Sequence, residues 1–348
     1  SNGVINVDRF VIDICRKDPK LWVVDLGAID TNGAVLEISE PVLKIYHLNN
    51  DTLVRRRLIP TEMYNQYQLG LTSVVVNVNP HNCADAYAYI IDSYNGAIIV
   101  YSWTEDKFWR FKSPMFYADA KYSRFMIKTL NGNLVSYFRN KQIFAGTSDI
   151  NNKQLIYHSL ASLDEFAINF TVLHNQSLAE CSSDKLDILY LGRKNEFGQT
   201  GSHVINRVTQ TVWGIQEQNH AITCWNRAKP LNPNSVKVVA ADLFQLPYPV
   251  DISRANGNVY VLSNNYRGIL SDGFNSSIPN FGIFYINETL GLTAFPECAT
   301  FRIPHYYPNY PCDPTNEHSS FYPPGHTFET AFYRSPVTPY AFADPYQS

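Results

Sequence analysis

The sequence predicts an all-β protein, and more specifically a β-propeller. Three segments repeat one pattern: LWVVDLG at 21–27, AYIIDS at 88–93 and VYVLSN at 259–264. Each is apolar and aromatic and ends on a small or polar residue, as a strand does when both of its faces are buried and its end lies near an open mouth. Strand-like runs also form groups of four over about 40–50 residues, which is typical of propeller blades. A β-sandwich, or a pair of them, is the alternative fold.

Composition agrees with a folded, strand-rich chain. Of 348 residues, 45% are hydrophobic and only 17% are charged, which argues against disorder over most of the length. Aromatic residues make up 14%, and they favour strands over helices. The net charge of −3 gives no electrostatic reason to expect a nucleic-acid or anionic-membrane partner. No apolar stretch approaches the roughly 18 residues needed to cross a bilayer, so we expect no membrane span.

The expected strands follow one another closely along the chain. In order they are 21–27, 42–48, 53–59, 73–78, 86–92, 97–103, 107–111, 125–129, 133–138, 143–146, 155–159, 170–173, 188–192, 203–208, 212–216, 222–225, 236–240, 249–253, 258–263, 268–270 and 282–286. Asn-Gly pairs at 95–96, 131–132 and 256–257 predict hairpin turns. Only 160–166 (LASLDEF) is a candidate for a short helix or turn.

Two regions follow from this pattern. Residues 1–300 are expected to form the propeller. Residues 301–348 are rich in Pro, Tyr, Phe and His, and proline blocks ladder hydrogen bonding. We expect an extended tail that wraps the body or docks on a partner, because its aromatic content is high for a free solvated segment.

Cysteines and glycosylation sequons indicate a secreted glycoprotein. The six cysteines lack C-x-x-C spacing and suit disulfides whose pairing the sequence leaves open: Cys15, Cys83, Cys181, Cys224, Cys298 and Cys312. Five N-x-S/T sequons begin at Asn50, Asn169, Asn175, Asn275 and Asn287. The chain opens without a signal peptide, so it is expected to be a processed, extracellular form.

Several segments carry a family resemblance. They are LWVVDLG at 21–27, CADAYAYIIDSYNGAIIVYSW at 83–103 with KFWRF at 107–111, QNHAITCW at 218–225 before Pro230, and PVDISRANGNVYVLS at 249–263. In this order they resemble the yellow / major royal jelly protein family of insects, over roughly residues 5–300. The resemblance implies a secreted, six-bladed β-propeller.

The start of the chain departs from that family. Members carry a much longer stretch before the equivalent of LWVVDLG than the 20 residues found here. A propeller must close, because open blade edges invite aggregation. Either the ring of this chain has fewer blades, or its missing sector comes from another polypeptide. We expect the second: the chain lacks the N-terminal sector of the ring, and an N-terminal fragment or another polypeptide completes it. A free Cys15 or Cys83 could bridge to that fragment.

A central funnel is the default binding site of a propeller. Salivary members of the family bind biogenic amines there, through a Thr before Asp-Ile-Ser and then an Asn and an aromatic residue. Asn264 and Tyr266 match the second part and Asp251 the first, but Val250 stands in place of the Thr. An amide oxygen and a ring face suit an aromatic ammonium ligand. The missing hydroxyl makes a more apolar ligand plausible, such as a pigment or a sterol. The structural alternative is that Asn264 forms a turn and Tyr266 packs on the rim.

Catalytic residues are less well indicated. Some members of the family are associated with dopachrome conversion in melanin synthesis, which needs a proton shuttle, and His220 or Asp92 are the candidates. Asp25, Asp92 and Asp251 more often cap turns at such positions, and a histidine such as His220 is more often a satisfied core residue. No triad, carboxylate pair or metal-ligand spacing stands out.

Three functions therefore remain open at this stage. The favoured one is a secreted propeller that binds a small aromatic or apolar ligand within a multi-chain assembly, with no other cofactor expected. The alternatives are a dopachrome-converting enzyme of a pigmentation pathway and a structural or storage subunit. Fold alone does not decide among them.

Overall fold

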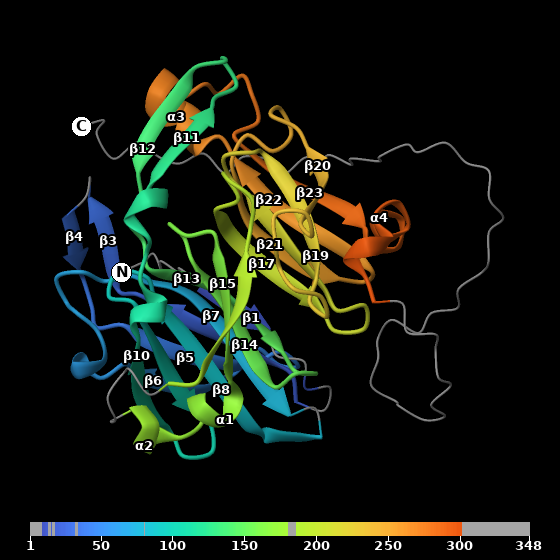
Figure 1. The fold of residues 1–348 in the computed structure, drawn as a ribbon. Coiled ribbons are helices and arrows are strands. Elements are labelled where there is room, and N and C mark those ends of the chain that lie inside the picture. Colours follow the sequence, from blue (N-terminus) through green and yellow to red (C-terminus); the bar gives the residue numbers. More distant parts are fainter. Residues whose placement is uncertain are drawn as a thin grey trace, which may run out of the picture.

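The computed structural model describes residues 9–12, 15, 18–31, 34–79, 81–179 and 186–300. These residues form five antiparallel sheets arranged as the blades of a propeller, together with two hairpins (Figure 1). Four of the sheets have four strands and the fifth has three. Helices are few and short, as the composition predicts.

Each blade is a run of consecutive strands, apart from one inserted hairpin. The blades are β1 (Arg9–Ile12), β2 (Lys20–Asp25), β5 (Val42–His47) and β6 (Leu53–Leu58); β7 (Leu71–Asn79), β8 (Asn82–Asp92), β9 (Ala97–Ser102) and β10 (Lys107–Lys112); β13 (Ile143–Asp149), β14 (Gln154–Ser159), β15 (Asp164–Asn169) and β16 (Ile188–Arg193); β17 (Thr200–Asn206), β18 (Thr211–Gln216), β19 (Ala221–Asn226) and β20 (Lys237–Ala241); and β21 (Pro249–Ala255), β22 (Asn258–Asn264) and β23 (Phe281–Asn287).

The remaining elements are two hairpins and four short α-helices, most of which are inserted within a blade. The hairpins are β3 (Ala28–Thr31) with β4 (Ala34–Glu37), and β11 (Arg124–Lys128) with β12 (Leu134–Phe138). The α-helices are α1 (Phe170–Leu173), α2 (Gln176–Ala179), α3 (Tyr266–Asp272) and α4 (Glu288–Ala294). Hairpin β11–β12 lies beside α3 (Figure 1), and Asp272 accepts hydrogen bonds from the Asn131 and Asn133 amides.

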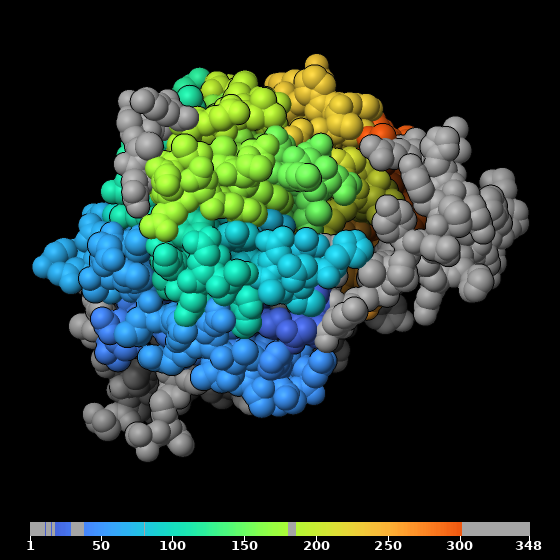
Figure 2. Space-filling view, turned by 90° about the horizontal axis from the view of Figure 1, so that it is seen from below, coloured from blue at the N-terminus to red at the C-terminus, as the bar shows by residue number. Residues whose placement is uncertain are grey.

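The first strand of each blade lies at the centre of the molecule. These inner strands pack side by side in the order β1, β7, β13, β17 and β21. The Thr72 hydroxyl on β7 donates to the Phe144 carbonyl on β13, and the Ser202 hydroxyl on β17 donates to Asp251 on β21. Both bonds join residues near the starts of their strands, so these inner strands run in the same direction. Figure 2 shows the order around the body as adjacent bands, from blue through green to yellow.

The repeated sequence pattern marks the second strand of a blade. LWVVDLG, AYIIDS and VYVLSN fall on β2, β8 and β22, each paired on both sides by neighbouring strands. Trp22 on β2 and Ile90 on β8 are fully buried, because apolar residues from adjacent blades pack against both faces. The polar ends of the repeat lie beside the starts of inner strands: Asp92 pairs with Leu71, and Ser263 with Pro249. These polar ends thus lie toward the end of the molecule where the inner strands begin.

Several expected elements are confirmed and several are wrong. The three Asn-Gly hairpins form, and Asn256 and Gly257 both adopt positive φ, at 50° and 71°, as a tight hairpin turn requires. Residues 170–173 form α1 and 268–270 lie in α3, so neither is a strand. Within 160–166, residues 164–166 begin β15, which pairs with β14 and is not helical. Pairing across the sheet overrides the local pattern there.

The expected number of blades is also wrong. The described residues form five blades rather than six. The resemblance implied six because it concerned family members with a longer N-terminal region. Residues 301–348, with the expected tail, lie outside the described residues.

Two disulfides are formed. Cys15 bonds to Cys83, joining the first two blades, and Cys224 on β19 bonds to Cys298 beyond α4. The expectation of a free Cys15 or Cys83 that bridges to another fragment is therefore wrong, because each is the other's partner. Cys181 and Cys312 lie outside the described residues.

Candidate functional site

A central channel is the main concave site of the described structure. It has a volume of about 500 Å³ and is lined by all five inner strands. A pocket of this size is within the usual range for small organic ligands. Three valines on different inner strands, Val76, Val204 and Val250, line it and remain partly exposed, so the wall has an apolar part.

One end of the channel carries a carboxylate and hydroxyls. Asp251 is exposed, and its Oδ1 accepts a hydrogen bond of 2.8 Å from the Ser202 hydroxyl. The neighbouring position 201 is a glycine. A Cβ there would come within 2.6 Å of Oε1 of Glu217, a buried side chain. Glu217 is held by Arg139 at 2.8 Å and by the Tyr248 hydroxyl at 2.9 Å. This end, where the inner strands begin, is the acidic mouth.

The other end of the channel carries two arginines. Arg207 follows the last residue of β17, and Arg254 is near the end of β21. Arg254 forms two hydrogen bonds to Glu288, of 2.9 and 2.6 Å, and Glu288 also accepts one from the Trp213 indole. We call this end, defined by Arg207 and Arg254, the basic end. Among the residues that line the channel, its positive charge is opposed only by Asp251 at the acidic mouth.

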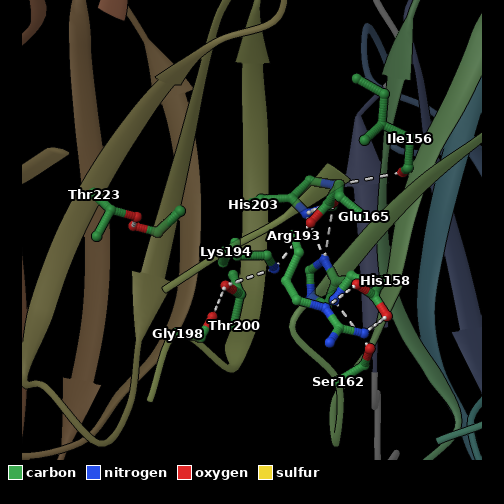
Figure 3. A network of polar contacts seen from close by, with 12 residues as sticks. Ile156, His158, Ser162, Glu165, Arg193, Lys194, Gly198, Thr200, His203 and Thr223 are labelled. Atoms are coloured by element: carbon green, nitrogen blue, oxygen red, sulfur yellow. Dashed lines mark hydrogen bonds and ion pairs between the residues drawn. The ribbon is translucent and has the colours of Figure 1, made fainter. Parts of the chain in front are cut away.

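A buried polar cluster lies behind the channel wall, between the third and fourth blades (Figure 3). It contains His158 on β14, Glu165 on β15, His203 on β17 and Lys194 just after β16. The two imidazole Nδ1 atoms are 2.8 Å apart, and Oε1 of Glu165 lies 3.2 Å from one and 3.3 Å from the other. Lys194 binds the other carboxylate oxygen at 2.9 Å. His203 also lines the channel, so the cluster contacts it there.

The charges within this cluster are balanced. Burial alone would raise the pKa of Glu165, but the charge of Lys194 and a hydrogen bond with His158 lower it below its usual range, so the carboxylate is ionised. Burial lowers the pKa of His203 to about 3 and also lowers that of His158, so both imidazoles are neutral at pH 7. The single negative charge of Glu165 is therefore neutralised by Lys194.

The same cluster contains the only group of metal-ligating side chains close enough to share an ion among the described residues: His158, Glu165 and His203. Imidazole and carboxylate are common ligands of zinc. However, Lys194 already neutralises Glu165, so a divalent ion would add two uncompensated charges to a fully buried site. The arrangement fits a polar joint between two blades better than a metal centre.

Comparison with known proteins decides the family. The sequence model of the family described as "Major royal jelly protein" matches residues 5–293. The chain belongs to the major royal jelly protein family. The resemblance drawn from the four sequence segments is thus confirmed.

Relatives of this royal jelly protein family member include yellow proteins of flies. L-dopachrome tautomerase yellow-f of Drosophila melanogaster is 27% identical over 268 residues, which are 76% of this chain and 60% of that protein. Protein yellow of Drosophila erecta is 28% identical over 290 residues, which are 82% of this chain and 51% of that protein. The chain thus spans between half and two thirds of the length of these relatives. Among solved structures, a chain of a nidogen/laminin complex matches with a TM-score of 0.48 and 11% identity, over 82% of this chain and 77% of that one.

Only two of the four ligand residues predicted for this royal jelly family chain line the channel. Val250 and Asp251 line it directly. Asn264 ends β22 beside the start of β21, and its side chain accepts a hydrogen bond of 3.0 Å from the Tyr266 backbone. Tyr266 begins α3, is 47% exposed and lies against Arg267. Asn264 therefore has the contact of a turn residue, while Tyr266 remains available at the surface.

The two catalytic candidates lie away from the channel wall. Nδ1 of His220 is within 3.2 Å of the Leu246 carbonyl and 3.0 Å of the Pro247 carbonyl, and burial lowers the pKa of this imidazole. Asp92 is fully buried, bonded to Asn95 and paired with Arg110 at 3.4 Å. Burial raises its pKa. Neither side chain lines the channel.

Sequence reasoning missed the residues that give this channel its polarity and its polar wall. Arg207, Arg254 and the pair His158–Glu165 carry no recognisable spacing, because each comes from a different part of the chain. His203 was expected at the start of a strand, 203–208, but not as a wall residue. Only the β17 register places it opposite His158.

No helix among the described residues is long and apolar enough to cross a membrane.

All five sequon asparagines are described, and four of them are exposed, with Asn169 partly so.

Proposed function

We propose that this chain is a secreted, ligand-binding member of the major royal jelly protein family, and that the ligand occupies the central channel. The observation that carries the proposal is the channel itself, with about 500 Å³ of space, valine walls and a few polar groups at its ends. Concave, largely apolar sites with a small number of placed polar groups are typical of small-molecule binding. The ligand we expect is a small aromatic or apolar molecule of the amine, pigment or sterol type.

The experiment is a binding measurement with a blocked variant. Isothermal titration calorimetry with serotonin, dopamine and a panel of apolar aromatic compounds is expected to identify at least one ligand. Ser253 lines the channel and is exposed to it, so Ser253→Trp is expected to abolish that binding. Val238→Trp adds the same ring to an exposed position of the outer strand β20 and is the matched control. Binding that survives in Ser253→Trp would contradict the proposed site.

A second candidate is dopachrome conversion. It is favoured by one relative, which is named an L-dopachrome tautomerase. The tautomerisation moves a proton, and His203 is a titratable wall residue with Glu165 and His158 behind it. His220 and Asp92 remain the residues that the sequence suggested for this role.

The hypothesis of dopachrome conversion is tested by measuring how fast L-dopachrome is lost in the presence of the purified chain. If His203 takes part, His203→Gln is expected to slow the reaction at least tenfold, while His220→Gln and Asp92→Asn leave it unchanged. Loss of activity in the His220 or Asp92 variants alone would assign the proton transfer to those residues. No acceleration by the wild-type protein would exclude the enzyme reading for this chain.

We also propose that another polypeptide, an N-terminal fragment or a different chain, contributes a further blade to the ring. Five blades are described, and the relatives are considerably longer. Native mass spectrometry of material purified from its source is expected to give a mass above that of one 39.6 kDa chain with its glycans. A mass equal to one glycosylated chain would overturn the assembly, and with it the structural-subunit alternative.

A further inference from the structure

The basic end of the channel contains a guanidinium that no described residue pairs with. Arg207 lines the channel and is only partly exposed. Within the described part of the chain its guanidinium forms no hydrogen bond and no ion pair, in contrast to the other arginine there, Arg254. Burial lowers the pKa of Arg207, and the nearby charge of Arg254 lowers it further, but arginine stays protonated at any physiological pH. The channel therefore holds a partly desolvated positive charge.

Two carboxylates of this region, Asp149 and Glu288, are already engaged with other residues. Asp149, which attracts Arg207 electrostatically, is fully buried, pairs with Arg227 at 3.6 Å and accepts a hydrogen bond of 2.6 Å from the Asn152 amide. Glu288 is shared between Arg254 and Trp213. Neither carboxylate forms an ion pair with Arg207, so among the described residues this charge has no ion-pair partner.

An unpaired charge that has lost part of its hydration is costly, and proteins usually pair such groups. The guanidinium fork matches a carboxylate in a planar, bidentate arrangement. Arg254 stands beside it with a second positive charge, held in place by Glu288. A negative group that enters the channel would therefore be attracted by the charges of both arginines. It could form a bidentate contact with the guanidinium of Arg207.

We propose that Arg207 binds a carboxylate of the ligand in the central channel, so that the ligand is an organic acid rather than an amine. This inference rests on the proposed function and specifies the substrate class of the same site. The two charged ends then orient the ligand: Asp251 repels the carboxylate from the acidic mouth, and the basic end attracts it. The apolar part of the ligand lies along Val76, Val204 and Val250.

The test compares three probes of the same ring size on the full chain: indole-2-carboxylate, indole-2-carboxamide and tryptamine. Isothermal titration calorimetry is expected to show indole-2-carboxylate binding at least tenfold more tightly than the other two. In Arg207→Gln this preference is expected to disappear, while the affinity for the carboxamide is unchanged. Arg207→Lys keeps the charge but not the fork, and is expected to retain part of the preference.

The matched control is Arg56→Gln, which removes an exposed arginine from the outer strand β6 of the first blade. It is expected to behave as wild type. Equal affinity for carboxylate and carboxamide, or a preference that survives in both Arg207 variants, would overturn the inference and leave the binding function standing. If none of the three probes binds but another compound does so in a manner blocked by Ser253→Trp, the organic-acid inference alone fails. If nothing binds, both fail.

Discussion

Lys194 and Glu165 form an ion pair of 2.9 Å in which both side chains are almost completely buried, at 7% and 4% exposure. Their immediate neighbours in sequence, Arg193 and Asp164, form another pair of 2.7 Å on the same two strands, but Arg193 is 47% exposed. The chain therefore carries a buried and an exposed ion pair one residue apart. This arrangement allows the effect of burial to be measured with little else changed.

We predict that Glu165→Gln destabilises the protein by about 3–5 kcal/mol, because it leaves the Lys194 charge buried without a partner. The control Asp164→Asn breaks the exposed pair and is expected to cost less than about 1 kcal/mol. Urea unfolding of the two variants, followed by tryptophan fluorescence, gives both values. Similar losses in the two variants would show that burial does not decide the strength of these pairs.

Stability is predicted to fall below neutral pH because of His203. Burial lowers the pKa of this imidazole to about 3, whereas an unfolded histidine titrates near 6.5. The unfolded state thus takes up the proton first, so the contribution is complete above about pH 6.5 and is lost as the pH falls toward 3. From pH 7 to pH 5 the loss is about 2 kcal/mol at 1.36 kcal/mol per pKa unit.

The measurement for this prediction is the free energy of unfolding at pH 7, 6 and 5. His174, whose pKa is lowered to about 4 by burial, acts in the same direction. His203→Gln is therefore expected to lower the number of protons taken up on unfolding by about one. The unfolding free energy of this variant still depends on pH, because His174 is unchanged. If the unfolding free energy of His203→Gln depends on pH as strongly as that of the wild type, His203 has the same pKa in the folded and the unfolded chain, and the prediction is wrong.

The disulfide Cys224–Cys298 is predicted to stabilise the fold by about 4 kcal/mol, from the chain entropy of the loop it closes. It links residues 74 positions apart and joins β19 to the segment after α4. The double variant Cys224→Ala with Cys298→Ala is expected to lower the unfolding free energy by that order. Peptide mapping without reduction should recover Cys15–Cys83 and Cys224–Cys298. Recovery of any other partner for these four residues would contradict the structure.

All five sequons are predicted to accept glycans. Each sequon asparagine uses its side-chain oxygen to accept a local backbone N–H, while no hydrogen bond from its amide nitrogen is formed within the described structure. The nitrogen that a glycan would occupy is thus available. Enzymatic removal of N-glycans converts each occupied asparagine to aspartate, which peptide mass spectrometry detects. The most buried of the five, Asn169, is expected to have the lowest occupancy.

The propeller was predictable from the sequence because its signals are local. The apolar core of a middle strand and its polar end repeat in β2, β8 and β22, and Asn-Gly marks three of the hairpins. The errors also have a local cause. Residues 170–173 and 268–270 are apolar enough for strands, but Asn169 caps the first as a helix, and the second lies inside α3.

The candidate site was only partly predictable. Val250 and Asp251 were placed at the funnel by the family resemblance, and both line the channel. Arg207 and the partners of His203 were not foreseen, because their importance depends on neighbours far along the chain. His203 and His158 are 45 residues apart in sequence and meet only where two blades pack together.

The sequence by itself determined the class of fold and the family, because strand periodicity, hairpin turns and ordered motifs are properties of short segments. Only the tertiary structure decided the number of described blades, the pairing of Cys15 with Cys83 and of Cys224 with Cys298, and the place of Arg207 at the basic end, where no described residue forms an ion pair with it. Each of these depends on which distant residues become neighbours when the blades assemble around the channel. Disulfide pairing, burial and ion pairing all depend on which residues the fold has brought together.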